Sequence, residues 1–259
     1  MAQLPSEAEF SRQIVEKYEQ DFAYARELSA LVAEVLQTGT VDTPDAYKTA
    51  IALIMGKAVK LHFSVIKLCE FAHTEDAGVV LRCLLNLYFI AAWLGKDNSI
   101  ARAKRYLAWY WVAMHRLMSS CESDVPNGWK GEIERQFQAH KDLFLSKGTI
   151  VWKWHQPDVG SIKQMATDVG LQKEYDEIYA YLSSLEHSDS LSYFGMLRAI
   201  DGKYHLNVHD DRMIPFYLFH SFRYFGELFK IWTGEFRVAK QDELERILGE
   251  TIRAWKPQQ

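Results

Sequence analysis

The sequence predicts an all-α protein, a multi-helix bundle with one small β-hairpin near residues 196–209. Apolar residues recur at three- and four-residue steps over most of the chain, which is the period of amphipathic helices. The 259 residues include only 6 prolines and 14 glycines, so long stretches have no helix breaker. The dipeptide Asp201-Gly202 is a strong turn signal between two short apolar stretches and predicts the hairpin.

The first half of the chain predicts four helices. Ser6 and Glu9 have the spacing of a capping box, in which each side chain accepts from the other residue's amide at a helix start. Proline at the first helical position loses no useful hydrogen bond, so Pro44 is expected to open the second helix. The expected helices run from Ser6 to Gly39, from Pro44 to His73, from a cap at Thr74 to Gly95, and from a cap at Asn98 to Ser120.

The second half predicts shorter helices around an aromatic loop. Residues 148–160 contain Trp152, Trp154 and His155 without a helical period, so an ordered loop is expected there. Ser161 is expected to cap the next helix, which Gly170 breaks. The expected helices cover residues 130–146, 161–169, 172–187, 211–232 and 241–255.

Composition is that of a folded globular protein. Hydrophobic residues make up 48% and charged residues 25%, and the formal net charge is −4. A mildly acidic chain is not attracted broadly to nucleic acid or to an anionic membrane surface. No linker-like tract or internal repeat divides the chain. This predicts one domain over residues 1–259, in which the half at 130–256 completes a bundle begun by helices of residues 6–120.

A cytoplasmic location is expected, because the first residues lack the basic and apolar regions of a secretory signal. The most apolar stretch, Val79–Leu94, contains Arg82 and Asn86 and is short of the ~20 residues that span a bilayer. We expect a helix buried on all sides, with no membrane contact. Three cysteines among apolar neighbours are expected to be reduced core residues: Cys69, Cys83 and Cys121.

A polar ridge is predicted on the helix that ends near His187. Tyr179, Ser183 and His187 follow at four-residue steps, which places a phenol, a hydroxyl and an imidazole along one helix face. Such groups can form a proton relay. They can also satisfy one another and the nearby backbone at a helix end, which is a structural role.

Arg82 is the second candidate, because it lies within a strongly apolar helix. A buried guanidinium without partners costs several kcal/mol, so a carboxylate, carbonyl groups or a bound anion should lie close to it. Asn86 follows one helical turn later. The sequence leaves both an ion pair and a ligand site open for Arg82, and the candidate carboxylates are Glu70, Glu75 and Glu186.

These residues resemble an uncharacterised, mainly bacterial all-helical family, catalogued as domain of unknown function 5677. The resemblance covers about residues 63–118 and 152–196, and it depends on the arginine at Arg82 and on the ridge from Tyr179 to His187. It implies a compact helical bundle in which Arg82 and His187 approach each other. The family pattern has a glutamate one turn after the arginine, where this chain has Asn86.

Helical families of this kind are compared with the HEPN ribonucleases of bacterial conflict systems, which is an analogy at the level of fold. Those enzymes use an arginine and a histidine four to six residues apart. Two pairs fit this spacing, Arg135 with His140 and Arg198 with His205, but two matches are close to the number that chance gives.

Metal and cofactor signals are weak in the sequence. Glu70 and His73 have the Glu-x-x-His spacing of di-iron bundles, but no second copy occurs. His205, Asn207 and His209 would share one face of a strand, without a further ligand at zinc spacing. There is no glycine-rich phosphate loop, and no GxSxG, HExxH or paired CxxC motif. We therefore expect neither a metal nor a cofactor.

The expected function is binding of, or action on, a phosphate-containing ligand, RNA or a nucleotide. In this hypothesis Arg82 holds the anion, His187 exchanges a proton, and Ser183 and Tyr179 orient it. Additional lining residues would be Asn86, Trp152 and Trp154.

The alternative function is a non-catalytic interaction or regulatory module of a bacterial defence or toxin–antitoxin system, with a structural polar cluster. Amphipathic helices near the termini are compatible with a homodimer. On the fourth helix, Tyr106, Trp109 and Tyr110 are expected to form the core face, with the arginines and lysine in solvent, although these residues could also contact RNA.

Overall fold

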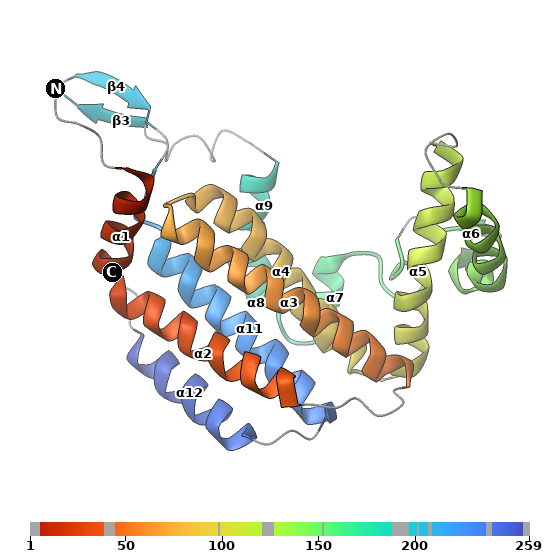
Figure 1. The fold of residues 1–259 in the computed structure, drawn as a ribbon. Coiled ribbons are helices and arrows are strands. Elements are labelled where there is room, and N and C mark those ends of the chain that lie inside the picture. The colour runs from red at the N-terminus through yellow and green to blue at the C-terminus, as the bar shows by residue number, and fades with distance from the viewer. Residues whose placement is uncertain are drawn as a thin grey trace.

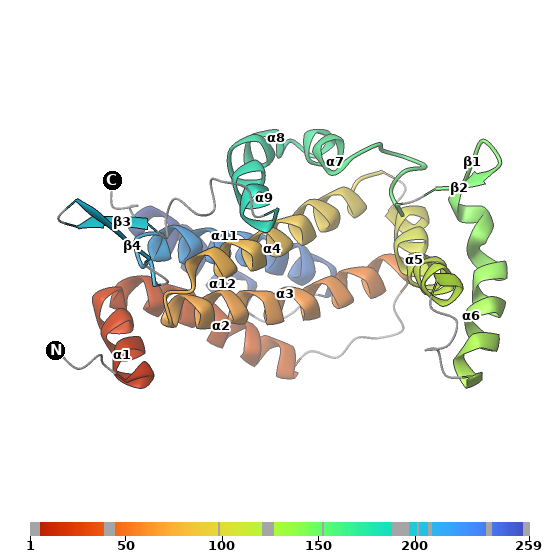
Figure 2. The same ribbon diagram turned by 90° about the horizontal axis from the view of Figure 1, so that it is seen from above.

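The protein is all-α with small β-hairpins, as the sequence predicts. A computed structural model describes residues 6–38, 45–97, 99–120, 127–151, 153–187, 197–200, 202–206, 209–236 and 240–255. Figure 1 shows long helices lying side by side in one body, from which α5 and α6 project as an arm. Figure 2, seen from above, shows α7, α8 and α9 together on one side of this body.

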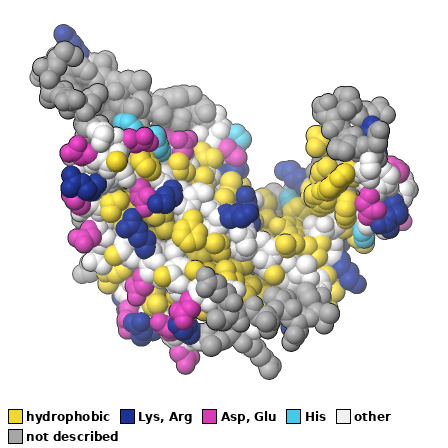
Figure 3. Space-filling model, in the orientation of Figure 1, with side chains coloured by type: hydrophobic (Ala, Val, Ile, Leu, Met, Phe, Trp, Pro, Cys, Tyr) yellow, Lys and Arg dark blue, Asp and Glu magenta, His cyan; other side chains and the backbone are white. Residues whose placement is uncertain are grey.

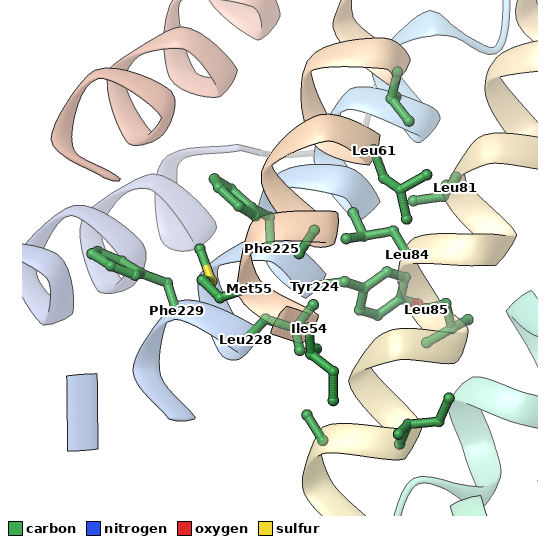
Figure 4. Close-up of a cluster of buried hydrophobic side chains, with 14 of the residues drawn as sticks. Ile54, Met55, Leu61, Leu81, Leu84, Leu85, Tyr224, Phe225, Leu228 and Phe229 are labelled. Carbon is green, nitrogen blue, oxygen red and sulfur yellow. The ribbon is translucent and has the colours of Figure 1, made fainter. Parts of the chain in front are cut away.

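Three long helices form the centre of the bundle: α3 (Ala46–Glu70), α4 (Thr74–Leu94) and α11 (Ile214–Phe236). Their apolar side chains pack into one buried cluster, which Figure 4 shows. Its members include Met55, Leu84 and Phe225, which are each at most 1% exposed. Two amphipathic helices cover this centre, α2 (Glu19–Thr38) against α11 and α12 (Gln241–Ala254) against α11 and α2.

Two of the central helices, α3 and α4, are long and apolar enough to cross a membrane by length and composition. In the bundle, 50% and 56% of their most apolar windows are buried within the protein. The fold thus gives these two helices apolar neighbours of its own, as is usual for core helices.

The first predicted helix is divided into two helices. Ser6 caps α1 (Glu7–Lys17) by accepting from the Glu9 amide at 3.3 Å, as the sequence predicts. The helix then ends at Tyr18, and α2 begins at Glu19. The prediction of one long helix is wrong because α1 turns to contact α3, while α2 follows α11.

The starts of α3 and α4 differ by a residue or two from prediction. Asp45 caps α3 by accepting from the Lys48 amide at 2.8 Å, so Pro44 precedes the cap. Thr74 is the first residue of α4 and not its cap, because its hydroxyl donates to the Asp210 carbonyl at 2.8 Å instead. This bond ties the start of α4 to the chain that leads into α11.

The arm consists of α5 (Ser99–Ser120) and α6 (Asn127–His140), which pack against each other. The helix predicted to reach Ser146 ends early in a 3₁₀ turn, Lys141–Phe144, and a hairpin of β1 (Leu145–Ser146) and β2 (Thr149–Ile150). Lys147 and Gly148 join the strands with φ of 52° and 78°, the positive values that a tight two-residue hairpin requires.

The elements after the arm follow the predicted order. Ser161 caps α7 (Ile162–Asp168) by accepting from the Gln164 amide, and Gly170, with φ of 76°, follows it. Three consecutive helical segments follow without a break: α8 (Gln172–Glu174), a π-helical turn (Tyr175–Tyr179) and α9 (Ala180–Glu186). The predicted hairpin is confirmed, with β3 (Leu197–Ile200) antiparallel to β4 (Lys203–Leu206) around Gly202.

Candidate functional site

Helix α4 has one face that is not enclosed. Cys83 is exposed, whereas Arg82 and Asn86 are half-buried. The prediction of a helix buried on all sides is therefore wrong, and so is the prediction of a core position for Cys83. Cys69 is buried as expected, and Cys121 lies outside the described residues. The reason is that α3 and α11 cover two sides of α4, and the shorter α7 and α9 cover the remaining side incompletely.

Arg82 forms an ion pair with Glu186 at the end of α9. Its Nη1 lies 2.5 Å from Glu186 Oε2, and the two side chains are 18% and 36% exposed. The guanidinium carbon lies 4.7 Å from the centre of the Tyr179 ring, which is within range of a cation–π contact. Of the three carboxylates that the sequence offered as partners for Arg82, the structure selects Glu186.

Two buried polar atoms beside this ion pair have no hydrogen-bond partner within the described residues. They are Nε of Arg82 and Oδ1 of Asn86. The residues are one helical turn apart on α4, so they lie on the same face. A buried donor or acceptor without a partner costs about 1–3 kcal/mol, so this face of α4 has unused capacity to bind a polar group.

His187 is the C-cap of α9 and its side chain is 72% exposed. Its Nε2 lies 3.8 Å from Glu186 Oε2, the same oxygen that contacts Arg82. The guanidinium and the imidazole are therefore both within 3.8 Å of one carboxylate oxygen. The structure thus brings Arg82 and His187 to the same place through Glu186.

The predicted ridge has one buried end and one exposed end. Tyr179 is 7% exposed and stacks on Tyr175, with ring centres 4.9 Å apart, at the end of the π-helical turn. Burial raises the pKa of Tyr179, and the positive charge of Arg82 partly opposes this effect. Ser183 is half-buried between Tyr179 and His187. Within the described part of the chain no hydrogen bond joins these three side chains, so they do not form a relay here.

Of the two tryptophans expected to line the site around Arg82, the structure describes Trp154, and it lies elsewhere. Trp154 is 8% exposed and packs edge-on against Trp93 and Tyr106, with ring centres 5.7 and 4.9 Å away. Trp93 is eleven residues after Arg82 on α4, about 16 Å along the helix axis. Trp154 therefore belongs to the junction between body and arm. It is not part of the Arg82 cluster, by which we mean Arg82, Asn86, Tyr179, Glu186 and His187. Trp152 lies outside the described residues.

Glu70, the acidic residue of the Glu-x-x-His spacing, has structural partners. Glu70 binds Arg26 at 2.8 Å and Lys67 at 2.6 Å, which ties α2 to α3. In the described ranges, no group of three or more His, Cys, Asp or Glu side chains is arranged to hold a metal ion. Asn207 is outside those ranges.

The two Arg–His pairs with HEPN spacing lie at the surface of α6 and in the β3–β4 hairpin. Arg135 is 67% exposed and donates to both carboxylate oxygens of Glu132, through Nε at 2.9 Å and Nη2 at 2.6 Å. Arg198 and His205 are direct register partners of the β3–β4 hairpin. The surface ion pair at Arg135 makes it a suitable comparison for Arg82.

Helix α5 confirms part of the prediction made for its two faces, because Tyr106 and Trp109 pack against the core and Lys104 is exposed, but its arginines and Tyr110 depart from it. Arg102 and Arg105 are only 16% and 17% exposed, and both lie against Asp158, with Arg105 Nη1 at 2.5 Å. Tyr110, expected in the core, is 47% exposed. The sequence did not reveal this arrangement because Asp158 lies in the aromatic loop, more than fifty residues away along the chain.

A protein-family model matches the central part of this chain. The model described as "Family of unknown function (DUF5677)" matches residues 48–204, which is more than half of the chain. The chain belongs to the DUF5677 family. Searches of curated proteins and of solved structures found no match.

The DUF5677 match contains the whole Arg82 cluster. Residues 48–204 extend from α3 to β4 and include Arg82, Asn86, Tyr179, Glu186 and His187. Helix α11, which also packs against α4, lies beyond this segment.

Proposed function

We propose that the protein binds a phosphate-containing ligand, RNA or a nucleotide, at the Arg82 cluster. One observation supports the proposal: the half-buried Arg82 is charge-paired, yet its buried Nε–H, a donor that a bidentate contact would use, has no partner among the described residues. Arginine binds phosphate best through two parallel N–H groups. A phosphate oxygen would use the donor that Glu186 leaves free.

Glu186 occupies the position beside Arg82 that a bound anion would take. Its carboxylate neutralises Arg82, and it is 36% exposed at the end of α9. A phosphate that enters from the solvent side would displace it, because the carboxylate can move into water at little cost. Asn86 Oδ1, buried and unpartnered, would accept a hydrogen bond from a ligand N–H or hydroxyl group.

His187 supplies the second group of this proposal. Its exposed imidazole lies beside the same Glu186 oxygen, so it would adjoin the bound phosphate. When protonated it adds a positive charge, and an imidazole beside a phosphodiester can accept the proton of the attacking hydroxyl group or donate one to the leaving oxygen. Hydrolysis of RNA, as in HEPN-like enzymes, is therefore part of the proposal and is tested in the same binding mixtures.

We propose a cytoplasmic location for this activity. The proposal is supported by the burial of half of the apolar windows of α3 and α4 within the bundle. Free Cys69 and Cys83 are compatible with a reducing compartment.

Fluorescence anisotropy with a labelled single-stranded RNA oligonucleotide, and with ATP as competitor, tests the binding proposal. We expect Arg82→Gln to weaken binding at least about tenfold, since it removes a charge-assisted bidentate contact. Glu186→Gln should strengthen binding severalfold, because the competing negative charge is gone. His187→Ala should weaken binding less than Arg82→Gln and should abolish any cleavage.

Arg135→Gln is the matched control, because Arg135 also pairs with a glutamate but lies on the open surface of α6. It should bind RNA and ATP like the wild-type protein. If Arg82→Gln and Arg135→Gln have equal affinities, the Arg82 cluster is a structural ion pair and the proposal fails.

The second candidate is an interaction module, and the exposed apolar face of α5 favours it. Tyr110 and Leu117 are 47% and 53% exposed on one helix. A large exposed apolar surface is typical of a protein contact. This role does not exclude ligand binding at α4.

A further inference from the structure

Helix α5 is apolar on two faces, and the body and α6 cover only one of them. The buried side chains on its 22 residues are small or medium in size: Ala103, Ala108 and Val112. On the covered side, His115 stacks on Phe137 of α6 and Trp109 packs against Phe144. The larger apolar residues on the other side, including Tyr110 and Leu117, stay exposed.

The exposed side follows a heptad pattern. Ile100, Leu107 and Met114 are seven residues apart, and Tyr110 and Leu117 stand three residues after the last two of them, whereas Ala103, three residues after Ile100, is buried within its own chain. These are the a and d positions of a coiled coil, whose seam normally faces another helix. Ile100 is 48% exposed, and Leu107 and Met114 are half-buried. No described element covers this seam along its outer half.

We propose that α5 pairs with α5 of a second copy, antiparallel and centred near Val112. In this register Tyr110 of one chain packs on Met114 of the other, and Leu107 packs on Leu117. Each layer occurs twice because of the two-fold axis, so four layers are built from four residues. An isologous contact of this kind needs one self-complementary surface, which the seam provides.

The seam of α5 is almost uncharged, so it suits an apolar surface such as the same seam of a second copy. Residues 99–120 contain no acidic residue, and Arg102 and Arg105 are held by Asp158 within the chain. Lys104 is the one charged residue that flanks the seam. Antiparallel pairing places it beside apolar Met118 of the other copy and keeps the two Lys104 side chains at opposite ends of the contact. The seam thus offers no charge pattern that an acidic or basic partner would match.

The two ends of the seam have complementary shapes. Near its start, Leu107 and Trp111 line an open pocket of about 360 Å³, together with Ala46 of α3 and Leu143 after α6. Near its other end, Leu117 projects into solvent at 53% exposure. The two leucines are ten residues, or about 15 Å, apart along the helix. Antiparallel pairing places Leu117 of each copy at the pocket of the other.

The overall shape leaves room for this contact. Figure 3 shows a hollow between the arm and the body, with hydrophobic side chains gathered along it. Because α5 projects from the body, as Figure 1 shows, a second arm can lie along its open side. The two copies would then contact each other through their α5 helices.

Sedimentation equilibrium of the full chain tests the proposal. We expect the mass of two chains at micromolar concentration for the wild-type protein. Leu117→Glu should give the mass of one chain, because it places a charge in two of the four layers, and Tyr110→Glu should do the same. Both positions are exposed in one chain, so circular dichroism and the thermal midpoint should remain those of the wild type.

Leu53→Glu is the matched control, because Leu53 is 60% exposed on α3 and lies outside the seam. It should remain a dimer. A wild-type monomer, or a dimer that survives Leu117→Glu and Tyr110→Glu together, overturns the proposal. If the monomer instead sediments with anionic lipid vesicles, the occupant of the seam is a membrane and not a second copy.

A cysteine variant tests the contact without adding charge. Ala113 flanks the seam close to the two-fold axis, so Ala113→Cys in both chains should form an intermolecular disulfide under mild oxidation. This is done with Cys83→Ser and Cys121→Ser to remove competing thiols. Absence of the cross-link in a protein with the mass of two chains would place the dimer contact elsewhere and overturn the proposed pairing.

Discussion

Helices α4 and α5 follow each other in the chain, have 21 and 22 residues and are both rich in apolar side chains, yet their surroundings differ. On α4, Leu81, Leu84 and Phe89 are fully buried. On α5, the large side chains Tyr110 and Leu117 are about half exposed. Hydrophobicity within a helix therefore does not determine its burial, which depends on the elements that reach it from elsewhere in the chain.

The comparison also separates two kinds of open surface. The open face of α4 is polar and contains a charged group with an unused donor, which suits a small anionic ligand. The open face of α5 is apolar and almost without charge, which suits another helix. Substitutions on the two helices should therefore act on different properties of the protein.

The largest expected effect is on stability, at the covered side of α4. Leu84→Ala should lower the free energy of unfolding by about 2–5 kcal/mol, because it leaves a cavity among α3, α4 and α11. Leu117→Ala on α5 should change the stability of the monomer by less than about 0.5 kcal/mol, because its side chain is exposed. Urea denaturation at a dissociating protein concentration measures both, and equal losses would contradict the comparison.

Acid should weaken the bundle around α4 before it affects the seam of α5. Burial lowers the pKa of His62 on α3 and of His220 on α11 to about 4, because a charged imidazole loses its hydration there. Both histidines titrate near 6.5 in the unfolded chain, which therefore binds more protons than the folded chain between pH 6.5 and pH 4. The free energy of unfolding should therefore decrease as the pH is lowered through this window, on the order of 1 kcal/mol per pH unit for each histidine.

Urea denaturation at pH 7, 6 and 5 measures this effect. The His62 Nε2–H donates to the Ala25 carbonyl at 3.3 Å, and Nδ1 accepts from the Ser221 hydroxyl at 2.7 Å. Protonation of Nδ1 removes this acceptor and also disturbs the packing of α2 on α3 and α11. A free energy of unfolding that stays constant from pH 7 to pH 5 would contradict the lowered pKa values of His62 and His220.

A third prediction concerns the fit of α9 on α4. A Cβ at Gly78 would lie 2.5 Å from the Leu185 side chain and 3.2 Å from the Tyr217 ring. Gly78→Ala should cost about 1–3 kcal/mol and should also weaken RNA binding, since Leu185 precedes Glu186 and α9 would shift. Gly56→Ala on α3, where a Cβ meets nothing within 4 Å, should instead stabilise by about 0.5–1 kcal/mol. The same denaturation and anisotropy measurements apply, and identical effects at Gly78 and Gly56 would contradict the close contact.

The smallest expected effect is at the start of α3. Asp45→Ala removes the acceptor of the Lys48 amide and should cost about 1 kcal/mol. The loss should appear in urea denaturation, with α-helix content otherwise unchanged. A substitution without effect would show that the amide finds another acceptor in solution.

Local signals in the sequence were sufficient for much of the fold. The Ser6 and Ser161 caps and the Asp201-Gly202 hairpin depend on neighbouring residues, and all three are found. The break at Tyr18 and the hairpin at Lys147-Gly148 depend on tertiary packing and on a lysine with positive φ, for which the sequence gives no strong signal.

The candidate site was predictable in part. A buried arginine requires a partner, and this reasoning included Glu186 among three carboxylates. It could not select Glu186, because the choice depends on α9 packing against α4. The π-helical turn before Tyr179 and the pairing of Arg105 with Asp158 were missed for the same reason: both depend on contacts between segments distant in the chain.

The most direct test of the account follows the Nε–H resonances of arginine by ¹⁵N-resolved nuclear magnetic resonance during titration with an RNA oligonucleotide, with Arg82→Gln assigning the Arg82 signal. The account predicts that the Arg82 Nε–H signal shifts and saturates with the ligand, because this buried donor gains a phosphate partner, while the signal of Arg135 stays constant. An Arg82 signal that does not change when the RNA is saturating would contradict the ligand site on α4.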